Sequence, residues 1–224
     1  MTTEVSKLLG RVMPRRAYSS MQRAMAAFEA KRYPQPTVPR LSPEHLAGAR
    51  LLPSRTELLR ELPRGGRVAE LGVNRGDFSA EILRESAPER LHLVDMWASG
   101  RYGDPERDHV LERFAAEREG GRVQVHLGPS TERVGDFADG YFDWVYIDTG
   151  HGYALTRDEL RAYAPKVKPG GYLAGHDYIP GNWAGRVRYG VIEAAHEFCV
   201  EYGWAVAFLT MEYPEHPSFA LRRL

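Results

Sequence analysis

The chain of 224 residues carries 30 basic and 30 acidic side chains, so its net charge is zero and nothing in the composition favours nucleic acid or an anionic membrane as a partner. The length suits one domain with a sizeable core and an N-terminal appendage. A single cysteine, Cys199, excludes an intrachain disulfide and fits a reducing cytoplasm, and the lack of any apolar run near about 18 residues excludes a transmembrane helix.

We expect residues 1–53 to form a helical cap followed by a proline-rich linker, and residues 54–224 to form the main, catalytic domain. Apolar residues at helical spacing predict a helix over residues 13–31, and four prolines between positions 34 and 43 then break the chain. The first forty residues are rich in arginine and poor in acids, which is also typical of a transit peptide, but a helical cap is the favoured interpretation. Such helices are suited to form the interface of a homodimer, but the sequence does not determine the oligomeric state.

From position 67 onward, short apolar runs alternate with helical patterns, which is typical of a doubly wound, mostly parallel sheet. The predicted fold class is therefore α/β and Rossmann-like, with seven strands. The strands are expected at residues 68–71, 91–94, 123–127, 144–147, 172–174 and 205–209, with a last one at 219–222 pairing antiparallel at the edge. The helices of this domain are expected at residues 54–62, 78–86, 105–118, 154–167 and 191–202.

The turn after the first of these strands is the most informative local pattern. Residues 68–78, VAELGVNRGDF, read as a strand that carries Glu70, a turn that contains Gly72 and Gly76, and the start of a helix. Glycines let the backbone approach a nucleotide-like ligand, and free N–H groups at the helix start point toward it. The spacing is not the dinucleotide pattern GxGxxG.

The next two strands end in residues suited to the rest of such a ligand. Asp95 lies 25 positions after Glu70 and is placed to accept hydrogen bonds from both ribose hydroxyls, with Met96 or Trp97 covering an adenine face. The alternative is that Asp95 only caps a helix. Ser130 either lines an adenine pocket or caps the short helix that follows it.

The fourth and fifth strands end in residues that carry chemistry. Asp148 and His151 follow one strand, and His176 and Asp177 follow the other. A carboxylate here can ligate a metal or act as a base, and an imidazole accepts a proton from an alcohol near neutral pH. Asp148, His176 and Asp177 are therefore expected to converge on one cation, unless they only cap helices or bridge loops.

Taken together, these segments resemble the class I S-adenosylmethionine (SAM) dependent methyltransferases. The E-x-G-x-x-x-G turn, ID-x-x-H-x-Y and K-P-G-G-x-x-x-x-HDY more narrowly resemble the metal-dependent, macrocin-type sugar O-methyltransferases of bacteria. The resemblance covers residues 67 to about 209. It implies transfer of a methyl group from SAM to a hydroxyl of a sugar or sugar-containing acceptor.

The resemblance also implies roles for individual residues. Asp148 and Asp177 hold Mg²⁺, and His176 stands where relatives usually have a carboxylate, which makes Mn²⁺ or Co²⁺ an alternative ion or gives His176 an outer role. His151 is the expected base, with Asp148 as the alternative. The residues expected to contact SAM are Glu70, Gly72, Asn74, Gly76, Phe78, Ser79, Asp95, Met96, Trp97, Ser130 and Asp148.

The stretch of residues 178–190, YIPGNWAGRVRYG, is expected to contact the acceptor. Trp183 is suited to stack on the apolar face of a sugar, and Asn182 and Arg186 offer hydrogen bonds to hydroxyls. Tyr178 opens this stretch and is included in the predicted acceptor site. An ordinary exposed loop is the competing interpretation.

Three rival functions differ in class. A metal-independent methyltransferase acting on a phenol or carboxylate shares the cofactor turn. A nicotinamide-dependent oxidoreductase is disfavoured because the second glycine of GxGxxG and a Tyr-x-x-x-Lys pair are missing. A non-catalytic SAM-binding module is disfavoured by Asp148, His151 and Asp177 at strand ends.

Overall fold

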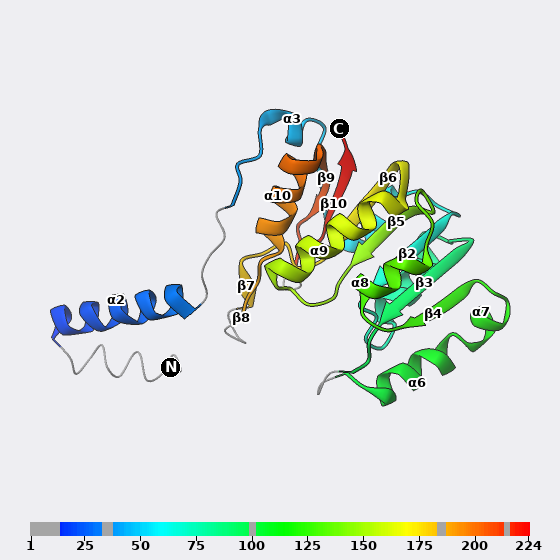
Figure 1. Cartoon of the computed structure of the whole chain (residues 1–224), viewed down its shortest axis with the longest axis horizontal. Helices are drawn as coiled ribbons and strands as arrows, with labels where there is room; N and C mark the ends of the chain where they lie inside the picture. The colour runs from blue at the N-terminus through cyan, green and yellow to red at the C-terminus, as the bar shows by residue number, and fades with distance from the viewer. Residues whose placement is uncertain (1–13, 33–37, 99–101, 183–186, 213–215) are drawn as a thin grey trace. The chain divides into compact units, whose positions relative to one another are not determined.

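The computed structural model describes residues 14–32, 38–98, 102–182, 187–212 and 216–224. The chain divides into two units, Met1–Thr37 and Val38–Leu224. In the first unit the described residues contain one helix, α2 (Arg15–Arg32), close to the helix predicted over residues 13–31 (Figure 1). The division lies ahead of the predicted boundary after residue 53, because residues 38–53 belong with the second unit.

The second unit is built on an eight-stranded sheet in the order β1-β9-β10-β6-β5-β2-β3-β4. Neighbouring strands are parallel except at β10, which runs antiparallel to both β6 and β9. This confirms the predicted α/β, mostly parallel architecture. The strands are β1 (Arg50–Leu52), β2 (Arg67–Leu71), β3 (Arg90–Asp95), β4 (Val123–Leu127), β5 (Phe142–Ile147), β6 (Val167–Gly175), β9 (Trp204–Thr210) and β10 (Phe219–Arg223), with β7 (Gly181–Asn182) and β8 (Val187–Arg188) paired as a separate ribbon.

Two details of the sheet differ from the prediction. The sheet has eight strands instead of seven, because β1, in the stretch predicted as linker, pairs with β9. Strand β10 lies inside the sheet and not at its edge, since Phe219 pairs with Gly175 of β6 on one side and with Leu209 of β9 on the other. The insertion of β10 brings the segment before it close to the end of β6.

The predicted helices are present, but one of them is divided, the helix expected over residues 154–167 ends at Tyr163, and a short helix at Pro43–Leu46 was not predicted. Residues 105–118 were expected as one helix, but the helix divides at Phe114. The helices are α3 (Pro43–Leu46), α4 (Arg55–Glu61), α5 (Asp77–Glu85), α6 (Asp104–Arg113), α7 (Ala115–Glu119), α8 (Ser130–Arg133), α9 (Tyr153–Tyr163) and α10 (Val191–Tyr202), with short 3₁₀ turns at Val134–Asp136 and Ala164–Lys166.

Alternating side chains of the strands build a core on each face of the sheet. In β5, Val145 and Ile147 join a cluster with residues of α9 and α10, whereas Trp144 and Tyr146 join a second cluster with residues of α4, α5 and α6. This is the period-two alternation of a strand covered on both faces. Figure 1 shows α9 and α10 side by side along the sheet.

The order of the strands places a crevice between β2 and β5. The chain runs from β2 to β3 and β4 in one direction and then returns to the other side of β2 to form β5. Ligands of open α/β sheets bind outside the carboxyl ends of the strands at such a reversal. The residues that follow β2, β3, β5 and β6 therefore lie where a ligand is expected.

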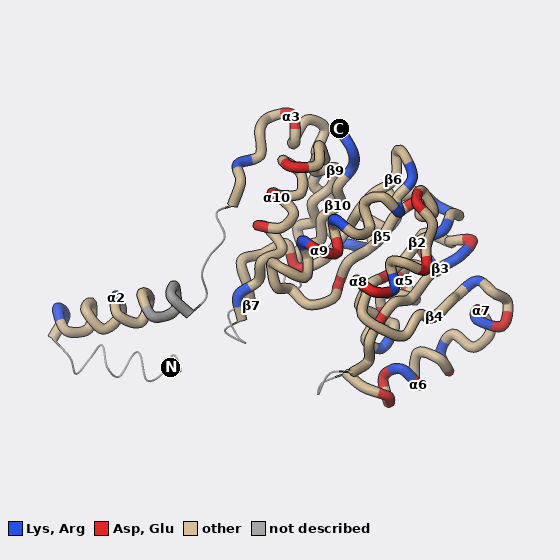
Figure 2. The backbone as a smooth tube through the Cα atoms, viewed as in Figure 1, with Lys and Arg blue, Asp and Glu red and all other residues tan. Residues whose placement is uncertain are grey.

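Charged residues of both signs are interspersed along the second unit (Figure 2). Partly exposed pairs such as Arg50 with Glu61 at 2.6 Å and Lys166 with Asp139 at 2.8 Å each contribute little to stability. The mixing agrees with the zero net charge of the sequence. Among the described helices, none combines the length and the hydropathy that crossing a bilayer requires.

Candidate active site

A pocket of about 820 Å³ opens at the carboxyl ends of β2, β3 and β5. It brings together residues that the sequence places far apart, including both the predicted cofactor residues and the predicted chemical groups. Gly76, Ser79, Tyr178 and Asn182 do not line it, and Trp183 and Arg186 lie outside the described residues. The predicted residues that line it are Glu70, Gly72, Asn74, Phe78, Asp95, Met96, Trp97, Ser130, Asp148, His151, His176 and Asp177.

The two glycines of the turn are required by the protein's own packing. Gly72 has φ +86°, and a Cβ there would lie 2.0 Å from the backbone oxygen of Asp148. This close approach keeps the ends of β2 and β5 together, with Asp148 donating its N–H to Leu71 at 2.7 Å. Gly76 has φ +75° and lies against Phe114, whose ring a Cβ would meet at 2.6 Å. Each position therefore requires glycine because of a positive φ and a close contact with a different neighbour.

Glu70 is buried at the end of β2, only 1% exposed, and accepts a hydrogen bond from the hydroxyl of Ser79. Burial raises the pKa of Glu70 well above its ordinary value, although the bond from Ser79 opposes the shift. The guanidinium of Arg55 lies nearby, 4.6 Å from the ring centroid of Phe78, and also lines the pocket. Ser79 therefore acts on Glu70, while Glu70 presents a carboxyl group and Arg55 a guanidinium to a ligand.

The carboxylate of Asp95 accepts hydrogen bonds from the glycine turn. It accepts hydrogen bonds from the N–H groups of Val73 at 2.7 Å, Asn74 at 3.0 Å and Trp97 at 2.9 Å. Trp97 is 3% exposed, and its indole N–H donates to the backbone oxygen of Asn74 at 2.8 Å. Met96 is exposed. Asp95 thus fixes the turn that it faces, and lone pairs on its oxygens are left for a ligand.

Asp177 lies at the centre of a group of histidines. His151 Nδ1 is 2.7 Å from Asp177 Oδ2, His216 Nδ1 contacts Oδ1, and His176 Nδ1 lies 3.6 Å from Oδ2. Burial acts to raise the pKa of Asp177, but the histidines hold it well below its ordinary value. Burial by itself lowers the pKa of His151, yet the hydrogen bond and charge of Asp177 outweigh it, and the pKa of His151 is raised.

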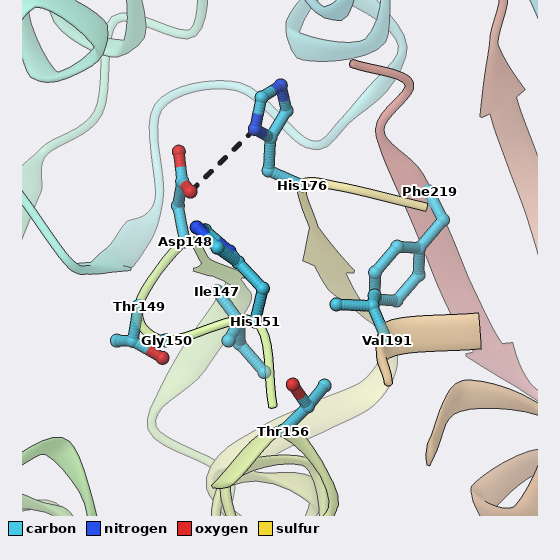
Figure 3. A pocket seen from close by; sticks show the side chains of 9 residues that line it. All are labelled: Ile147, Asp148, Thr149, Gly150, His151, Thr156, His176, Val191 and Phe219. Carbon is cyan, nitrogen blue, oxygen red and sulfur yellow. Dashed lines mark ion pairs between the residues drawn. The ribbon is translucent and has the colours of Figure 1, made fainter. Parts of the chain in front are cut away.

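Asp148 faces the same group from the end of β5. Its Oδ1 lies 3.7 Å from His176 Nδ1, and both side chains border a small adjoining pocket with His151 (Figure 3). Burial raises the pKa of Asp148, although the charge of His176 opposes this. Ligand atoms of Asp148, His151 and Asp177 lie within 4.8 Å of one another, which makes them a candidate metal site.

His216 belongs to the site but was not predicted, and Tyr189 lies in the stretch expected to contact the acceptor without having been singled out. His216 precedes β10, and its ring stacks 6.3 Å from that of His176. His216 reaches this position only because β10 lies inside the sheet. The sequence pattern placed β10 at the edge, so His216 was not predicted as a site residue. The ring of Tyr189 lies 4.5 Å from that of His151.

Tyr178 and Asn182 do not reach the pocket. The hydroxyl of Tyr178 bonds His196 Nε2 at 2.5 Å, and its ring packs 5.7 Å from that of Phe219. Tyr178 is therefore occupied by α10 and β10. Asn182 lies in the ribbon of β7 and β8.

Residues 69–178 match the family model described as a methyltransferase domain. This segment is a methyltransferase domain. It begins one residue before Glu70 and extends past Asp177, so it holds the predicted cofactor and metal residues, while Arg55, Tyr189 and His216 come from outside it.

Solved structures similar to this chain share its fold at low sequence identity. A candidate caffeoyl-CoA O-methyltransferase from Staphylococcus aureus is 13% identical, with 98% of this chain and 97% of that chain covered and a TM-score of 0.57. The B. subtilis M1A22 tRNA methyltransferase TrmK is 16% identical, covering 77% and 67%, with a TM-score of 0.54. The M. capricolum TrmK, solved with S-adenosylhomocysteine (SAH), is 11% identical, covering 78% and 70%, also at 0.54. No curated protein sequence matches this chain.

Proposed function

We propose that this protein is a SAM-dependent O-methyltransferase that methylates a hydroxyl of a sugar or sugar-containing acceptor with the assistance of a divalent ion. The observation that carries the proposal is the hydrogen bond of His151 to Asp177 within the same pocket as Glu70, Gly72 and Asp95. A base held beside a cofactor pocket is what methyl transfer to a hydroxyl requires.

The cofactor end of the pocket suits the methionine part of SAM. That part carries an ammonium and a carboxylate; Glu70 offers a carboxyl oxygen to the ammonium, and Arg55 offers its guanidinium to the carboxylate. Asp95 and Met96 line the pocket where the ribose and adenine would follow. The volume of about 820 Å³ lies in the upper part of the range of small-molecule sites, which leaves room for an acceptor beside the cofactor.

His151 is the proposed base. Its Nδ1 is taken by Asp177, which leaves Nε2 to accept the proton of the acceptor hydroxyl. The acceptor oxygen attacks the methyl carbon of SAM, the bond from sulfur to that carbon breaks with its electron pair going to sulfur, and SAH leaves. Asp177 holds the ring in place and stabilises the imidazolium that forms. Asp148 is the alternative proton acceptor.

The cluster of Asp148, His151, His176 and Asp177 fits a divalent ion by its donor chemistry. Two carboxylates and an imidazole suit Mn²⁺ or Co²⁺ better than Mg²⁺, which prefers oxygen ligands. Asp148 and Asp177 would hold the ion, with His176 as the third ligand expected from the sequence. The histidine whose ligand atom lies within 4.8 Å of both carboxylates is His151. Such an ion lowers the pKa of an acceptor hydroxyl when bound.

A metal-independent transfer to a phenol or a carboxylate is the second candidate. One observation favours it: both oxygens of Asp177 are already engaged by histidines, Oδ2 by His151 and Oδ1 by His216. In that case Asp177 serves only to orient imidazoles, and His151 acts without an ion.

The test is transfer of a labelled methyl group from SAM to a panel of sugars, glycosylated compounds and phenols, with tRNA as a further arm. Each reaction is run with Mg²⁺, with Mn²⁺ and with EDTA. Sugar methylation that stops in EDTA and returns with a divalent ion supports the proposal. Turnover that ignores EDTA favours the second candidate, and methylation of tRNA alone would contradict both.

A further inference from the structure

Glu159 is a buried carboxyl that the proposed mechanism does not use. It lies on α9 with none of its surface exposed. The hydroxyl of Thr149 donates to it, with Oγ1 at 2.9 and 2.7 Å from the two carboxylate oxygens. The hydroxyl of Ser130 also donates to it. A single carboxylate therefore joins the loop after β4 to the loop after β5.

Ser130 and Thr149 are both among the residues that line the large pocket. Thr149 follows Asp148 directly, and Ser130 begins α8 on the side predicted for adenine. Helix α9 holds the Ser130 loop a second time, because the hydroxyl of Tyr163 donates to the backbone oxygen of Ser130 at 2.9 Å. The position of both loops thus depends on α9.

The ionised carboxylate sets the direction of these hydrogen bonds. A carboxylate only accepts, and a hydroxyl has one proton to donate. While the hydroxyls of Ser130 and Thr149 donate hydrogen bonds to Glu159, each hydroxyl oxygen can only accept a hydrogen bond from a ligand.

We propose that Glu159 is a positioning residue that turns Ser130 and Thr149 into hydrogen-bond acceptors, so that Ser130 selects the exocyclic amino group of the adenine of SAM. This rests on the proposed function, since it presupposes an adenine in the pocket. A purine with a carbonyl in place of the amino group would bring its carbonyl oxygen against the hydroxyl oxygen of Ser130, and neither could donate a hydrogen bond to the other.

The selection depends on pH in a defined direction. Burial raises the pKa of Glu159 to about 7, although the bonds from Ser130 and Thr149 oppose this. The charge of Asp158, an exposed residue of the same helix, also acts to raise this pKa, and Glu159 in turn acts to raise the pKa of Tyr163. Below that pH Glu159 carries a proton and becomes a donor, so one hydroxyl loses its fixed direction.

The test compares the affinity of the full chain for SAH and for S-inosylhomocysteine, which has a carbonyl in place of the adenine amino group. Calorimetry is run from pH 6 to pH 8.5 on the wild type, Glu159→Gln and the matched control Asp158→Asn, which removes an exposed carboxylate from the same helix. At pH 8.5 the wild type and the control are expected to favour SAH about tenfold, the factor that one hydrogen bond supplies. This preference declines through pH 7, while in Glu159→Gln it is small and does not change with pH.

A Glu159→Gln protein that keeps the full preference and its pH dependence overturns the inference while leaving the proposed function intact. A wild type that binds neither nucleoside overturns both. If Glu159→Gln fails to fold, as its melting curve will show, Ser130→Ala replaces it. That variant is expected to lose the preference for the amino group as well, and retention of the preference would overturn the inference.

Discussion

His151 and Asp177 follow neighbouring parallel strands, and Nδ1 of the histidine lies 2.7 Å from Oδ2 of the aspartate. Asp177 has a positive φ of 58°, a conformation that a non-glycine residue holds at a cost of about 1–3 kcal/mol. Its neighbour His176 donates its backbone N–H to Ile147 at 3.0 Å, which ties this turn to β5. The strained turn aims Asp177 at three imidazoles.

The rate of methyl transfer should rise with pH. His151 accepts a proton only when neutral, and its pKa is raised above the ordinary value of 6.5 because Asp177 outweighs the effect of burial. The profile of kcat/KM is therefore expected to have its lower midpoint above pH 6.5. In Asp177→Asn the midpoint should move down and the rate should fall. An unchanged midpoint in that variant would contradict the assignment of Asp177.

Replacing Gly72 by alanine should unfold the site. The added Cβ meets backbone at 2.0 Å and forces a side chain onto φ +86°, so a loss of about 3 kcal/mol or more is expected in chemical denaturation. Gly65→Ala is the matched control, because Gly65 has φ +76° but nothing within 4 Å of the added Cβ. It should cost only about 1–2 kcal/mol. Equal losses would show that the contact with Asp148 is unimportant.

Glu70→Gln should make the protein more stable and a weaker cofactor binder. The pKa of Glu70 is raised in the folded state by burial, so its contribution to stability is present below its unfolded pKa and is lost as the pH rises. The variant lacks that loss, and its melting temperature at pH 8 should exceed that of the wild type. Its affinity for SAH should fall. A less stable variant with normal affinity would mean that Glu70 has a purely structural role.

Arg55→Gln should weaken the binding of SAH more than the binding of 5′-methylthioadenosine. The two ligands share the adenosine and the sulfur, but only SAH has the carboxylate that the guanidinium is placed to meet. A charge-assisted hydrogen bond of about 1.5–3 kcal/mol corresponds to a loss of roughly ten- to a hundredfold for SAH. Both affinities follow from calorimetry. A parallel loss for the two ligands would place Arg55 elsewhere in the pocket.

Short-range patterns in the sequence predict most of this fold and much of the pocket. The turn that holds Glu70 and Gly72 and the acid at Asp95 can be recognised because their roles depend on residues nearby in the chain and on the order of the strands. The partners of Asp95 are backbone N–H groups, which no side-chain pattern reveals.

The rest depends on contacts between distant segments. His216 reaches Asp177 only because β10 inserts between β6 and β9, and short strands such as β1 carry too few residues for a period to show. Tyr178 was predicted to face the acceptor, yet a single turn of the chain directs its hydroxyl to His196. The sequence around Glu159 does not distinguish it from an exposed polar residue of the helix, because its burial depends on Ser130 and Thr149, which lie in other loops.

The most direct test of the proposed chemistry is the rate of methyl transfer by His151→Ala, with SAH affinity measured on the same preparation. Loss of a positioned base should lower kcat by about 10²–10⁴-fold, while the affinity for SAH stays within a few fold of the wild type. Full turnover by His151→Ala would contradict the assignment of the base and leave Asp148 as the proton acceptor.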